Sequence, residues 1–428
     1  MTRYDKAISL LEEASRSGSR LGLERIYELC RRLGNPQDKP GTIHVAGTNG
    51  KGSFSAMLSS VLTAQGYLTG TFSSPSMLEV RDSIRIGGRV VSEDEFADAV
   101  IKAAAAAELM EDKPTEFELL TAAAFQLFSD IGCVYTVIEC GMGGDGDSTN
   151  VITKPLLSVI TNVSLDHCTF LGNTVAEIAG HKAGIIKQGT PAYFGGKSDD
   201  ALKVISGEAE RKGSELYTCA SFRNTNYETA GLPSGTSVVH GSKVYHTPLF
   251  GTCQSENLVN VLNCIDILRK EGIVISEEAV VKGLEKVRWE GRFEFLSRDP
   301  EIVFDGAHNP DGMMKLCESI RLYFGEVRPA AVIGVLEDKD YSAYSVLLKP
   351  LISRVFAVSP DNPRALPSDK LAEVFSAGGI KADAYPSIAD GLDAAYRYCS
   401  ENGLPLLVIG SLYMYKDVVG ALKYIKSK

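Results

Sequence analysis

The sequence predicts an α/β protein with two domains, the first built on a mostly parallel sheet and the second a smaller α/β domain. Three observations lead to this expectation. Apolar, β-branched segments alternate with helical segments at the spacing typical of a parallel sheet covered on both faces. A glycine-rich turn joins a strand to a helix near residue 50, and a fresh strand–loop–helix pattern begins after residue 288. The 428 residues are enough for two domains.

Capping residues mark several of the expected helices. Ser92 precedes a segment with acidic residues in its first turn, and Thr115 with Glu118 makes a capping box. The helices are expected at 1–34 (two helices), 51–65, 92–110, 115–132 and 271–287.

Short β-branched or alternating runs indicate the strands. Residues 190–250 are expected to alternate shorter strands and turns, and the domains are expected to be 1–288 and 289–428. The expected strands lie at 43–47, 69–74, 84–86, 135–141, 156–164, 301–304, 330–336, 354–360 and 405–412.

Composition excludes several classes of protein. The net charge of -10 argues against a general binder of nucleic acid or anionic membranes. The nine cysteines contain no C-x-x-C pair, which argues against a zinc site or a disulfide framework and favours a reducing cytoplasm. No apolar run approaches the roughly 20 residues that span a bilayer. The charged, amphipathic start is unlike a signal peptide.

The stretch IHVAGTNGKGSFSAML (43–58) predicts a phosphate-binding loop between a strand and a helix. Backbone N–H groups of a glycine-rich turn form a concavity that favours anions. Lys51 would reach the outer phosphates, and the Ser53 hydroxyl would bind Mg²⁺. Gly52 separates these two residues, unlike the general P-loop pattern, so a generic glycine-rich turn is the alternative. The loop comprises Gly47, Thr48, Asn49, Gly50, Lys51, Gly52 and Ser53.

Polar side chains follow two further strands. Glu139 ends one strand, and Asp166 and His167 follow another. Ligands bind at the carboxyl ends of strands in open α/β sheets, so these groups and Ser53 are candidates to hold a divalent cation beside a triphosphate. A histidine ligand is unusual for Mg²⁺. Spacing alone equally allows Glu139 to be a cap partner and His167 a loop residue.

Two further groups have ordinary structural interpretations. Lys182 lies on a helix with apolar neighbours, and the pattern alone favours a solvated charge. Arg292, Asp305, His308 and Asn309 begin the second domain, where a cleft facing the first domain would bring them to the nucleotide. Their turn-forming composition alone favours a simple turn.

Together these motifs resemble the folylpolyglutamate synthase/dihydrofolate synthase family, relatives of the Mur peptide ligases. The ordered set runs from near the first residue to near the last. The matching stretches are LGLERIYELCRRLGNPQ (21–37), HVAGTNGKGS (44–53), SSPSMLEVRDSIRI (73–86), TEFELLTAAAFQLF (115–128), IECGMGGDGDSTNV (138–151), ITNVSLDHCTFLGNTVAEIAGHKAGIIKQGTP (160–191), WEGRFEFL (289–296), DGAHNPDG (305–312), DKD (338–340) and GSLYMY (410–415).

The resemblance implies a fold and a set of residue roles. The fold is a P-loop-containing, mostly parallel sheet domain followed by a smaller Rossmann-like α/β domain, as in Mur ligases. The loop 47–53 would bind ATP, and two Mg²⁺ ions are expected. Lys182 would be carbamylated on its amine, which reverses the pattern-only interpretation. The implied roles are Mg²⁺ binding by Ser53, Glu139, His167 and Lys182; nucleotide binding by Asn257, Arg292 and Asp305; glutamate binding by His308 and Ser411; and catalysis by Lys51, Lys182 and His308.

The resemblance implies ATP-dependent amide formation. The carboxylate of dihydropteroate, or of a tetrahydrofolate's terminal glutamate, would attack the γ-phosphoryl group, and L-glutamate would then attack the acyl phosphate. The two domains would close to exclude water. The protein would act as a cytoplasmic monomer on small molecules, without nucleic acid or membrane partners.

Three departures from the family pattern leave alternatives open. The family commonly has His, Arg and His where this chain has Ser76, Asp145 and Cys253. The change at Asp145 reverses a charge expected near the triphosphate. The alternatives are a divergent Mur-type amino-acid ligase with another carboxylate acceptor, and a nucleotide-binding regulatory protein without activity. The intact loop and metal-ligand positions argue against the second.

Overall fold

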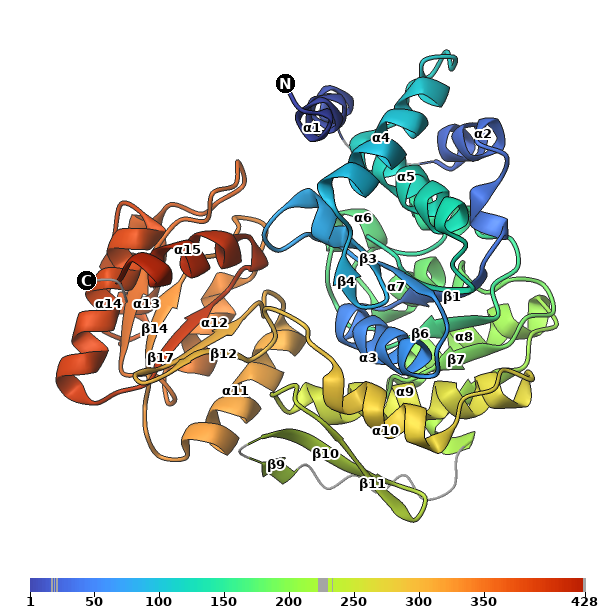
Figure 1. The fold of residues 1–428 in the computed structure, drawn as a ribbon. Helices are drawn as coiled ribbons and strands as arrows, with labels where there is room; N and C mark the ends of the chain where they lie inside the picture. The colour runs from blue at the N-terminus through green and yellow to red at the C-terminus, as the bar shows by residue number, and fades with distance from the viewer. Residues whose placement is uncertain (17, 19, 21, 222–229, 233, 426–428) are drawn as a thin grey trace. The chain divides into compact units, whose positions relative to one another are not determined.

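The computed structural model describes residues 1–16, 18, 20, 22–221, 230–232 and 234–425, which form two units. Its path is drawn in Figure 1. The first unit comprises Met1–Tyr227, Val238–Thr247 and Glu256–Val287, and the second comprises Glu228–Ser237, Pro248–Ser255 and Arg288–Lys428.

An eight-stranded sheet with the order β4-β3-β2-β5-β1-β6-β7-β8 organises the first unit. The neighbouring strands in the run β2-β5-β1-β6-β7-β8 pair in parallel. At the edge, β3 pairs antiparallel with both β2 and β4. Its strands are β1 (Gly41–Ala46), β2 (Thr69–Phe72), β3 (Ile84–Ile86), β4 (Arg89–Val90), β5 (Tyr135–Glu139), β6 (Leu157–Ile160), β7 (Ala192–Phe194) and β8 (Leu216–Thr218). Because β1, β5 and β6 are adjacent and parallel, their carboxyl ends meet at one edge.

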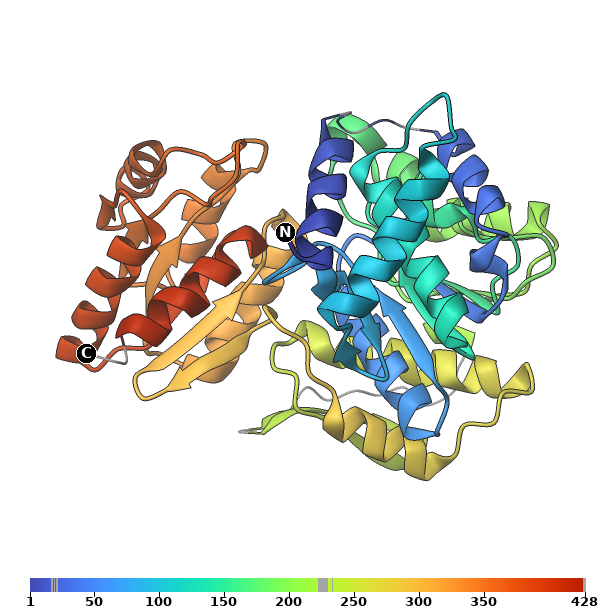
Figure 2. The same ribbon diagram turned by 45° about the horizontal axis from the view of Figure 1, so that its top comes forward.

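Helices cover both faces of this sheet, which explains why its central strands are apolar on both sides. One face packs on α1, α2, α4 and α5 at one end and on α7 and α8 at the other. Figure 2 shows α1, α4 and α5 lying together. The helices are α1 (Arg3–Ser15), α2 (Glu24–Arg32), α3 (Lys51–Ala64), α4 (Glu93–Ala107), α5 (Glu116–Ile131), α6 (Cys168–Leu171), α7 (Val175–Ala183), α8 (Asp199–Arg211), α9 (Cys253–Lys270) and α10 (Glu277–Lys286).

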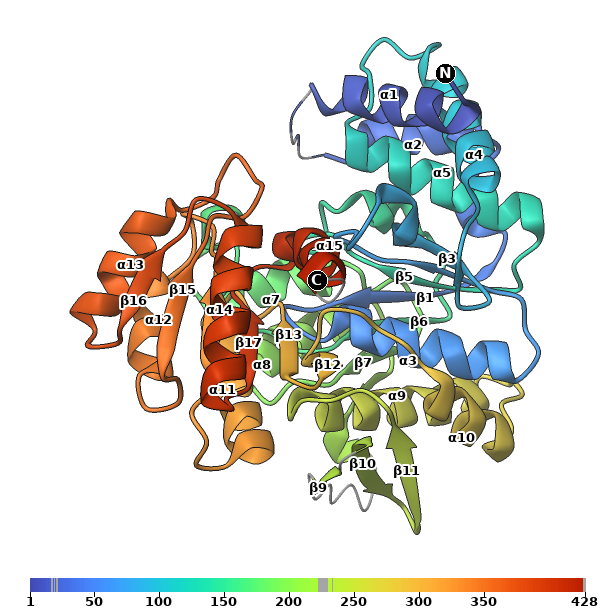
Figure 3. The same cartoon turned by 60° about the vertical axis from the view of Figure 1, so that its left-hand side comes forward.

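The opposite face carries α3, which packs on β2 and β5 and against α10 (Figure 3). Helix α9 lies on this face as well, because its asparagine side chains reach Tyr193 of β7. Tyr193 and Phe194 are consecutive in the strand and therefore point to opposite faces. Phe194 packs in the core formed with α7 and α8.

Capping residues correctly predicted the starts of two helices, whereas the residue pattern over 190–250 did not predict the helix found there. Ser92 and Thr115 form the expected caps, each within a capping box. The expectation of only short strands and turns over 190–250 is wrong, because α8 occupies Asp199–Arg211 behind a Ser198 cap. The expected strand 156–164 stops at Ile160, and the helix expected over 271–287 begins only at Glu277.

A buried ion pair fastens α2 to α5. The Arg25 Nε atom lies 3.0 Å from Oε2 of Glu118, and both side chains are almost fully buried. The same carboxylate oxygen accepts a hydrogen bond of 2.7 Å from the backbone N–H of Thr115. Removing either partner of such a pair would leave a buried charge uncompensated.

The second unit is a six-stranded sheet with the order β12-β13-β17-β14-β15-β16. All pairs are parallel except β12 with β13. Helices α11, α12 and α13 share a core with one face of the sheet. The elements are β12 (Glu294–Arg298), β13 (Glu301–Asp305), β14 (Ala330–Ile333), β15 (Arg354–Ala357), β16 (Ala382–Ala384), β17 (Leu406–Ile409), α11 (Pro310–Phe324), α12 (Tyr341–Leu348), α13 (Ser368–Ala377), α14 (Ile388–Asn402) and α15 (Tyr415–Ile425).

The α14 helix packs on β14 and β15 and against α15. Parallel strands with helical connections give the predicted smaller α/β unit, so the predicted fold class is confirmed. A separate three-stranded sheet contains β9 (Ala230–Leu232), β10 (Gly235–His240) and β11 (Lys243–Thr247). Within the described ranges, no helix is long and apolar enough to cross a bilayer.

Candidate active site

The glycine-rich loop follows β1 and turns into α3. Gly47 has φ of 150°, and a Cβ atom there would collide with the Thr161 side chain. Gly50 is the N-cap of α3 with φ of 83°, a left-handed conformation that favours glycine. The strand, the tight turn and the helix start are therefore arranged as a phosphate-binding loop requires.

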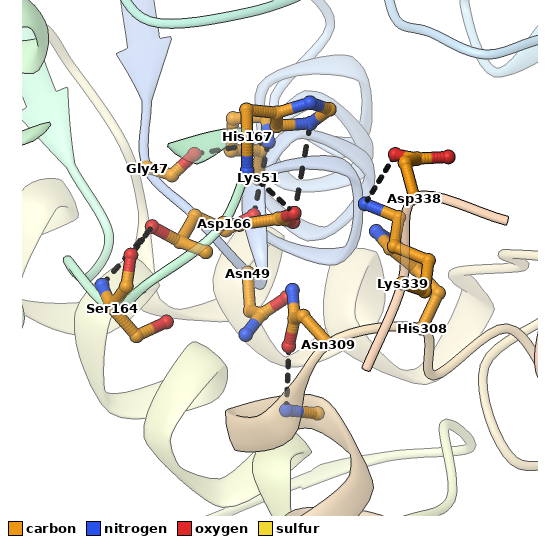
Figure 4. A network of polar contacts seen from close by, with 12 residues as sticks. Gly47, Asn49, Lys51, Ser164, Asp166, His167, His308, Asn309, Asp338 and Lys339 are labelled. Carbon is orange, nitrogen blue, oxygen red and sulfur yellow. Dashed lines mark hydrogen bonds and ion pairs between the residues drawn. The ribbon is translucent and has the colours of Figure 1, made fainter. Parts of the chain in front are cut away.

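The Lys51 amine folds back over this loop. Nζ donates to the carbonyl oxygens of Gly47 at 3.0 Å and Thr48 at 3.2 Å (Figure 4). It also lies 3.9 Å from Oε1 of Glu139. Lys51 thus places a positive charge at the loop and faces the carboxylate that ends β5.

The loop is fastened to the segment that follows β6. The Asn49 N–H donates to the Asn162 side-chain oxygen at 2.8 Å, and the Thr161 hydroxyl donates to the Asn49 carbonyl at 2.7 Å. The backbone N–H of Ser164 donates to the Thr48 hydroxyl at 3.1 Å, and that hydroxyl donates to the Ser164 carbonyl. These contacts begin directly after the end of β6 at Ile160. The polar run Thr161–Asn162 after an apolar strand was the signal that the sequence analysis missed.

Glu139 and Ser53, two of the residues predicted to bind Mg²⁺, lie near the carboxyl edge of the sheet. Glu139 is the last residue of β5, and Ser53 lies in the first turn of α3; both side chains are buried. Asp166 and His167 lie beyond β6, where the His167 N–H donates to Oδ1 of Asp166 at 2.8 Å. His167 has a positive φ of 51° and caps the short helix α6. The adjacency of β5, β1 and β6 brings these segments to one sheet edge.

Lys182 is buried in α7, with only 3% of its surface exposed. The interpretation of this lysine as a solvated charge, made from its helical pattern, is therefore wrong. Burial lowers the pKa of Lys182 to about 7, and the positive charge of Lys51 acts in the same direction. The negative charges of Asp166 and Asp147 act in the opposite direction and favour the protonated amine. Lys182 is thus a buried amine close enough to Lys51 to be affected by its charge.

Asp145, the departure at the expected arginine position, has a partner of its own. Its two carboxylate oxygens lie 2.9 and 3.0 Å from Nδ1 of His181. Its backbone N–H donates to the His181 carbonyl at 2.8 Å. A Cβ atom on Gly184 would overlap Asp145. The Asp145 carboxylate, which stands where the family commonly has an arginine, therefore pairs with His181, the residue before Lys182. The sequence analysis did not identify this pairing.

A buried polar network lies immediately behind Glu139. The His44 Nε2 atom lies 2.8 Å from the Thr149 hydroxyl and 3.2 Å from the Cys140 thiol. The Thr149 hydroxyl donates to Oδ1 of Asp147 at 2.5 Å. Burial lowers the pKa of His44 to about 3, so the imidazole is neutral. The network joins β1, β5 and the loop that follows β5.

The side chains at this sheet edge are suited to a Mg²⁺ ion that takes its remaining ligands from water and a nucleotide. Among the described residues, no three His, Cys, Asp or Glu side chains converge on a possible metal position. Ser53 and Glu139 supply a hydroxyl and a carboxylate at the same sheet edge. Mg²⁺ typically uses one or two carboxylates and takes its other ligands from water and substrate phosphates. The residues therefore fit a magnesium ion bound together with a nucleotide.

Asn257 of α9 belongs to the first unit and contacts the loop. A Cβ atom on Gly50 would overlap the Asn257 side-chain oxygen. Asn257 is buried. The structure therefore brings this predicted nucleotide-binding residue to the phosphate loop.

The remaining predicted nucleotide-binding residues lie in the second unit. Asp305 ends β13, and its carboxylate accepts hydrogen bonds of 2.8 Å from the backbone N–H groups of Phe293 and Ala307. Burial raises the pKa of Asp305, while the charge of Arg292 acts in the opposite direction. Arg292 lies in the segment 287–293 between α10 and β12, which also holds Trp289, the single tryptophan.

His308 and Ser411 leave adjacent strand ends. Asp305 pairs with Ile409 in the parallel strands β13 and β17, so both following loops start at one sheet edge. His308 Nδ1 donates to the Gly306 carbonyl at 2.8 Å. Ser411 is buried and accepts a hydrogen bond from the Tyr413 N–H at 3.3 Å. Asn309 forms the N-cap of α11, with its side-chain oxygen accepting from the Gly312 N–H (Figure 4).

The chain matches two families of domains. Residues 45–265 match the Mur ligase middle domain, and residues 291–412 match the Mur ligase glutamate ligase domain. The dihydrofolate synthase/folylpolyglutamate synthase of Bacillus subtilis is 36% identical over 437 residues, covering 99% of this chain and 100% of the relative.

Solved structures give the same result. The Mycobacterium tuberculosis folylpolyglutamate synthase complexed with ADP and AMPPCP superposes with a TM-score of 0.88 at 28% identity, covering 99% of each chain. Escherichia coli FolC in complex with DHPP and ADP superposes with a TM-score of 0.84 at 27% identity, covering 98% of each chain. The chain therefore belongs to the dihydrofolate synthase/folylpolyglutamate synthase family of Mur ligases, which are ATP-dependent, amide-forming enzymes.

Proposed function

We propose that this protein joins L-glutamate to the carboxylate of dihydropteroate, to the terminal glutamate of tetrahydrofolates, or to both. ATP would supply the phosphoryl group of an acyl phosphate, and ADP and phosphate would be released. The observation that carries this proposal is the intact phosphate loop, with Lys51 opposite Glu139, in a chain that matches a Bacillus subtilis dihydrofolate synthase/folylpolyglutamate synthase over 99% of its length.

Residues 47–53 would bind the triphosphate. Their N–H groups and the N-terminus of α3 favour anions, and Lys51 would neutralise charge that develops on the transferred phosphoryl group. Because phosphoryl transfer depends mainly on positioning and electrostatics, a fixed loop and one cation account for much of the expected rate enhancement. The contacts of Asn162 and Thr161 with Asn49 would hold the loop rigid for this purpose.

Ser53, Glu139 and His167 would hold a magnesium ion beside the triphosphate. When bound, Mg²⁺ would neutralise negative charge on the triphosphate during phosphoryl transfer. Glu139 is well suited to this role because its buried carboxylate already lies next to a cation.

The second unit would supply groups for the nucleotide and for the incoming amino acid. Arg292 and Asp305 are assigned to the nucleotide, and His308 and Ser411 to L-glutamate. The common sheet edge from which the loops of His308 and Ser411 emerge supports the assignment of these two residues to one ligand. His308 has its Nδ1 hydrogen held by a carbonyl, which orients the ring.

Acceptor-dependent phosphate release tests the proposed function. The purified protein is incubated with MgATP and L-glutamate in three parallel reactions: with dihydropteroate, with tetrahydrofolate and without an acceptor. We expect phosphate release and a mass gain of one glutamyl unit on at least one acceptor, because the loop and the charged residues are intact.

The three reactions separate the alternatives. A product from dihydropteroate alone would define a dihydrofolate synthase, and a product from tetrahydrofolate alone a polyglutamate synthase. No turnover with either acceptor would contradict the proposal and would favour a divergent ligase with another carboxylate acceptor. The engagement of Asp145 by His181 argues against that alternative, because the reversed charge is already satisfied there.

We further propose that Lys182 carries a carbamate. The reaction adds the neutral amine to CO₂, forming the N–C bond and releasing one proton. A buried ammonium beside the positive charge of Lys51 is unfavourable, whereas a carbamate would pair with that charge and offer oxygen ligands to a second Mg²⁺. The burial of the amine and the effect of the Lys51 charge on it support this assignment.

The carbamate is tested by ¹³C NMR in buffer that contains ¹³C-labelled bicarbonate. We expect one protein-bound carbamate signal in the unmodified protein and in Lys187→Met, and no such signal in Lys182→Met. Lys187 is the matched control, since it is also largely enclosed but donates to the Asn150 carbonyl at 3.0 Å. An unmodified protein that lacks the signal, or a Lys182→Met variant that retains it, would refute the assignment.

We also propose a reducing, cytoplasmic location and action as a monomer on small molecules, without nucleic acid or membrane partners. The nine cysteines all lie among the described residues and form no disulfide, and the net charge is -10. The first property fits a reducing compartment. The second disfavours association with polyanions.

A further inference from the structure

Helix α9 presents three asparagines to the sheet. Asn257, Asn260 and Asn263 are spaced by three residues, and side chains at this spacing lie near one another along a helix. All three are buried in the described structure, with exposures of 6%, 4% and 0%. Buried amides are costly unless they are hydrogen-bonded, so the partners of these side chains fix how the helix sits on the sheet.

The Tyr193 hydroxyl joins two of these asparagines. It donates to the side-chain oxygen of Asn260 at 2.8 Å and accepts from the side-chain nitrogen of Asn263 at 2.9 Å. Tyr193 is fully buried in β7, and burial raises its pKa well above 10, so the hydroxyl keeps its proton. The Asn263 oxygen lies 3.1 Å from Nε2 of His240, which extends the network. One phenol oxygen thus connects the sheet to two turns of α9.

Two glycines allow the same helix to lie unusually close to the sheet edge. A Cβ atom on Gly195, just beyond β7, would lie 2.5 Å from the Asn260 side chain. A Cβ atom on Gly50 would overlap the Asn257 side chain in the same way. A shift of α9 that moved Asn260 against Gly195 would therefore also move Asn257 against the phosphate loop.

We propose that Tyr193 is a positioning residue for the nucleotide: its hydroxyl fixes α9 through Asn260 and Asn263 and thereby sets Asn257 against Gly50. This inference rests on the proposed function, because it assumes that the phosphate loop binds a nucleotide. Tyr193 does not touch the loop itself. Its effect on the loop is transmitted through α9, in which Asn260 lies against Gly195 and Asn257 lies against Gly50.

The Tyr193→Phe variant removes one oxygen atom and keeps the ring. We expect it to weaken binding of MgAMPPCP, measured by calorimetry, by about fivefold, the effect of losing one net hydrogen bond. The KM for ATP should rise by a similar factor, while kcat and the KM for L-glutamate stay unchanged. Tyr67→Phe is the matched control, because its hydroxyl donates to the Val274 carbonyl at 2.9 Å at the other end of α3. That variant should bind MgAMPPCP normally.

A double-mutant cycle separates positioning from general stabilisation. If Tyr193 acts through Asn257, then Tyr193→Phe should cause no further loss of MgAMPPCP affinity in an Asn257→Ala background. Additive losses would contradict the proposal, as would unchanged affinity in the single variant. If Tyr193→Phe fails to fold, Asn263→Ala removes one of the hydroxyl's contacts and is measured in the same cycle. Failure of the unmodified protein to bind MgAMPPCP would instead refute the proposed function.

Discussion

Replacing Lys51 by Met should lower acceptor-dependent phosphate release by roughly 10³-fold while the fold survives. Met has a similar length but carries no charge, so the variant removes the cation that the phosphate loop holds. In the protein, the Lys51 amine donates to two nearby loop carbonyls and faces Glu139 at 3.9 Å. The variant should still fold, because Met keeps the length of the side chain, although the temperature of thermal unfolding should fall somewhat because Glu139 loses its nearby cation.

The matched control for this variant is Lys113→Met. Lys113 also donates to two backbone carbonyls, those of Ala107 at 3.2 Å and Glu108 at 2.9 Å, but lies away from the phosphate loop. Its replacement should leave turnover at the level of the unmodified protein. Lys51→Met that retains full turnover would show that the loop cation is not needed for phosphoryl transfer.

Glu139→Gln should lower kcat by roughly 100-fold, corresponding to about 3 kcal/mol of transition-state stabilisation. The amide keeps the shape of the side chain but removes the negative charge assigned to Mg²⁺. We expect a higher Mg²⁺ concentration to be needed for half-maximal turnover. The measurement is phosphate release over a range of Mg²⁺ concentrations at fixed ATP.

Glu118→Gln is the control for the loss of a buried, paired glutamate. Glu118 lies against Arg25, and its replacement should lower the free energy of unfolding without changing the Mg²⁺ dependence. An identical Mg²⁺ dependence in Glu139→Gln and in the unmodified protein would show that Glu139 does not hold the ion.

Local chemistry made much of the fold predictable. The caps at Ser92 and Thr115 were recognisable because each is a hydroxyl followed three residues later by a glutamate. The phosphate loop was recognisable because its glycines, its lysine and its serine all lie within the short segment 47–53. In contrast, α8 was missed, although Ser198 and two aspartates mark its start, because the surrounding segments suggested short strands.

Properties that depend on tertiary packing were not predictable from local pattern. The apolar neighbours of Lys182 did not by themselves show that its amine is buried, since that depends on how α7 packs. The pairing of Asp145 with His181 joins positions 36 residues apart. The contact of Tyr193 with Asn260 spans 67 residues. Such contacts are fixed by the order of strands in the sheet, which a single sequence does not state.

The segment between α10 and β12 makes this protein convenient for optical spectroscopy. Trp289 is the only indole in the sequence and lies three residues before Arg292. Light absorbed selectively by tryptophan is therefore emitted from one known place in the chain, without overlap from other indoles. The intrinsic emission of the unlabelled protein thus reports the surroundings of the segment that also holds a residue assigned to the nucleotide.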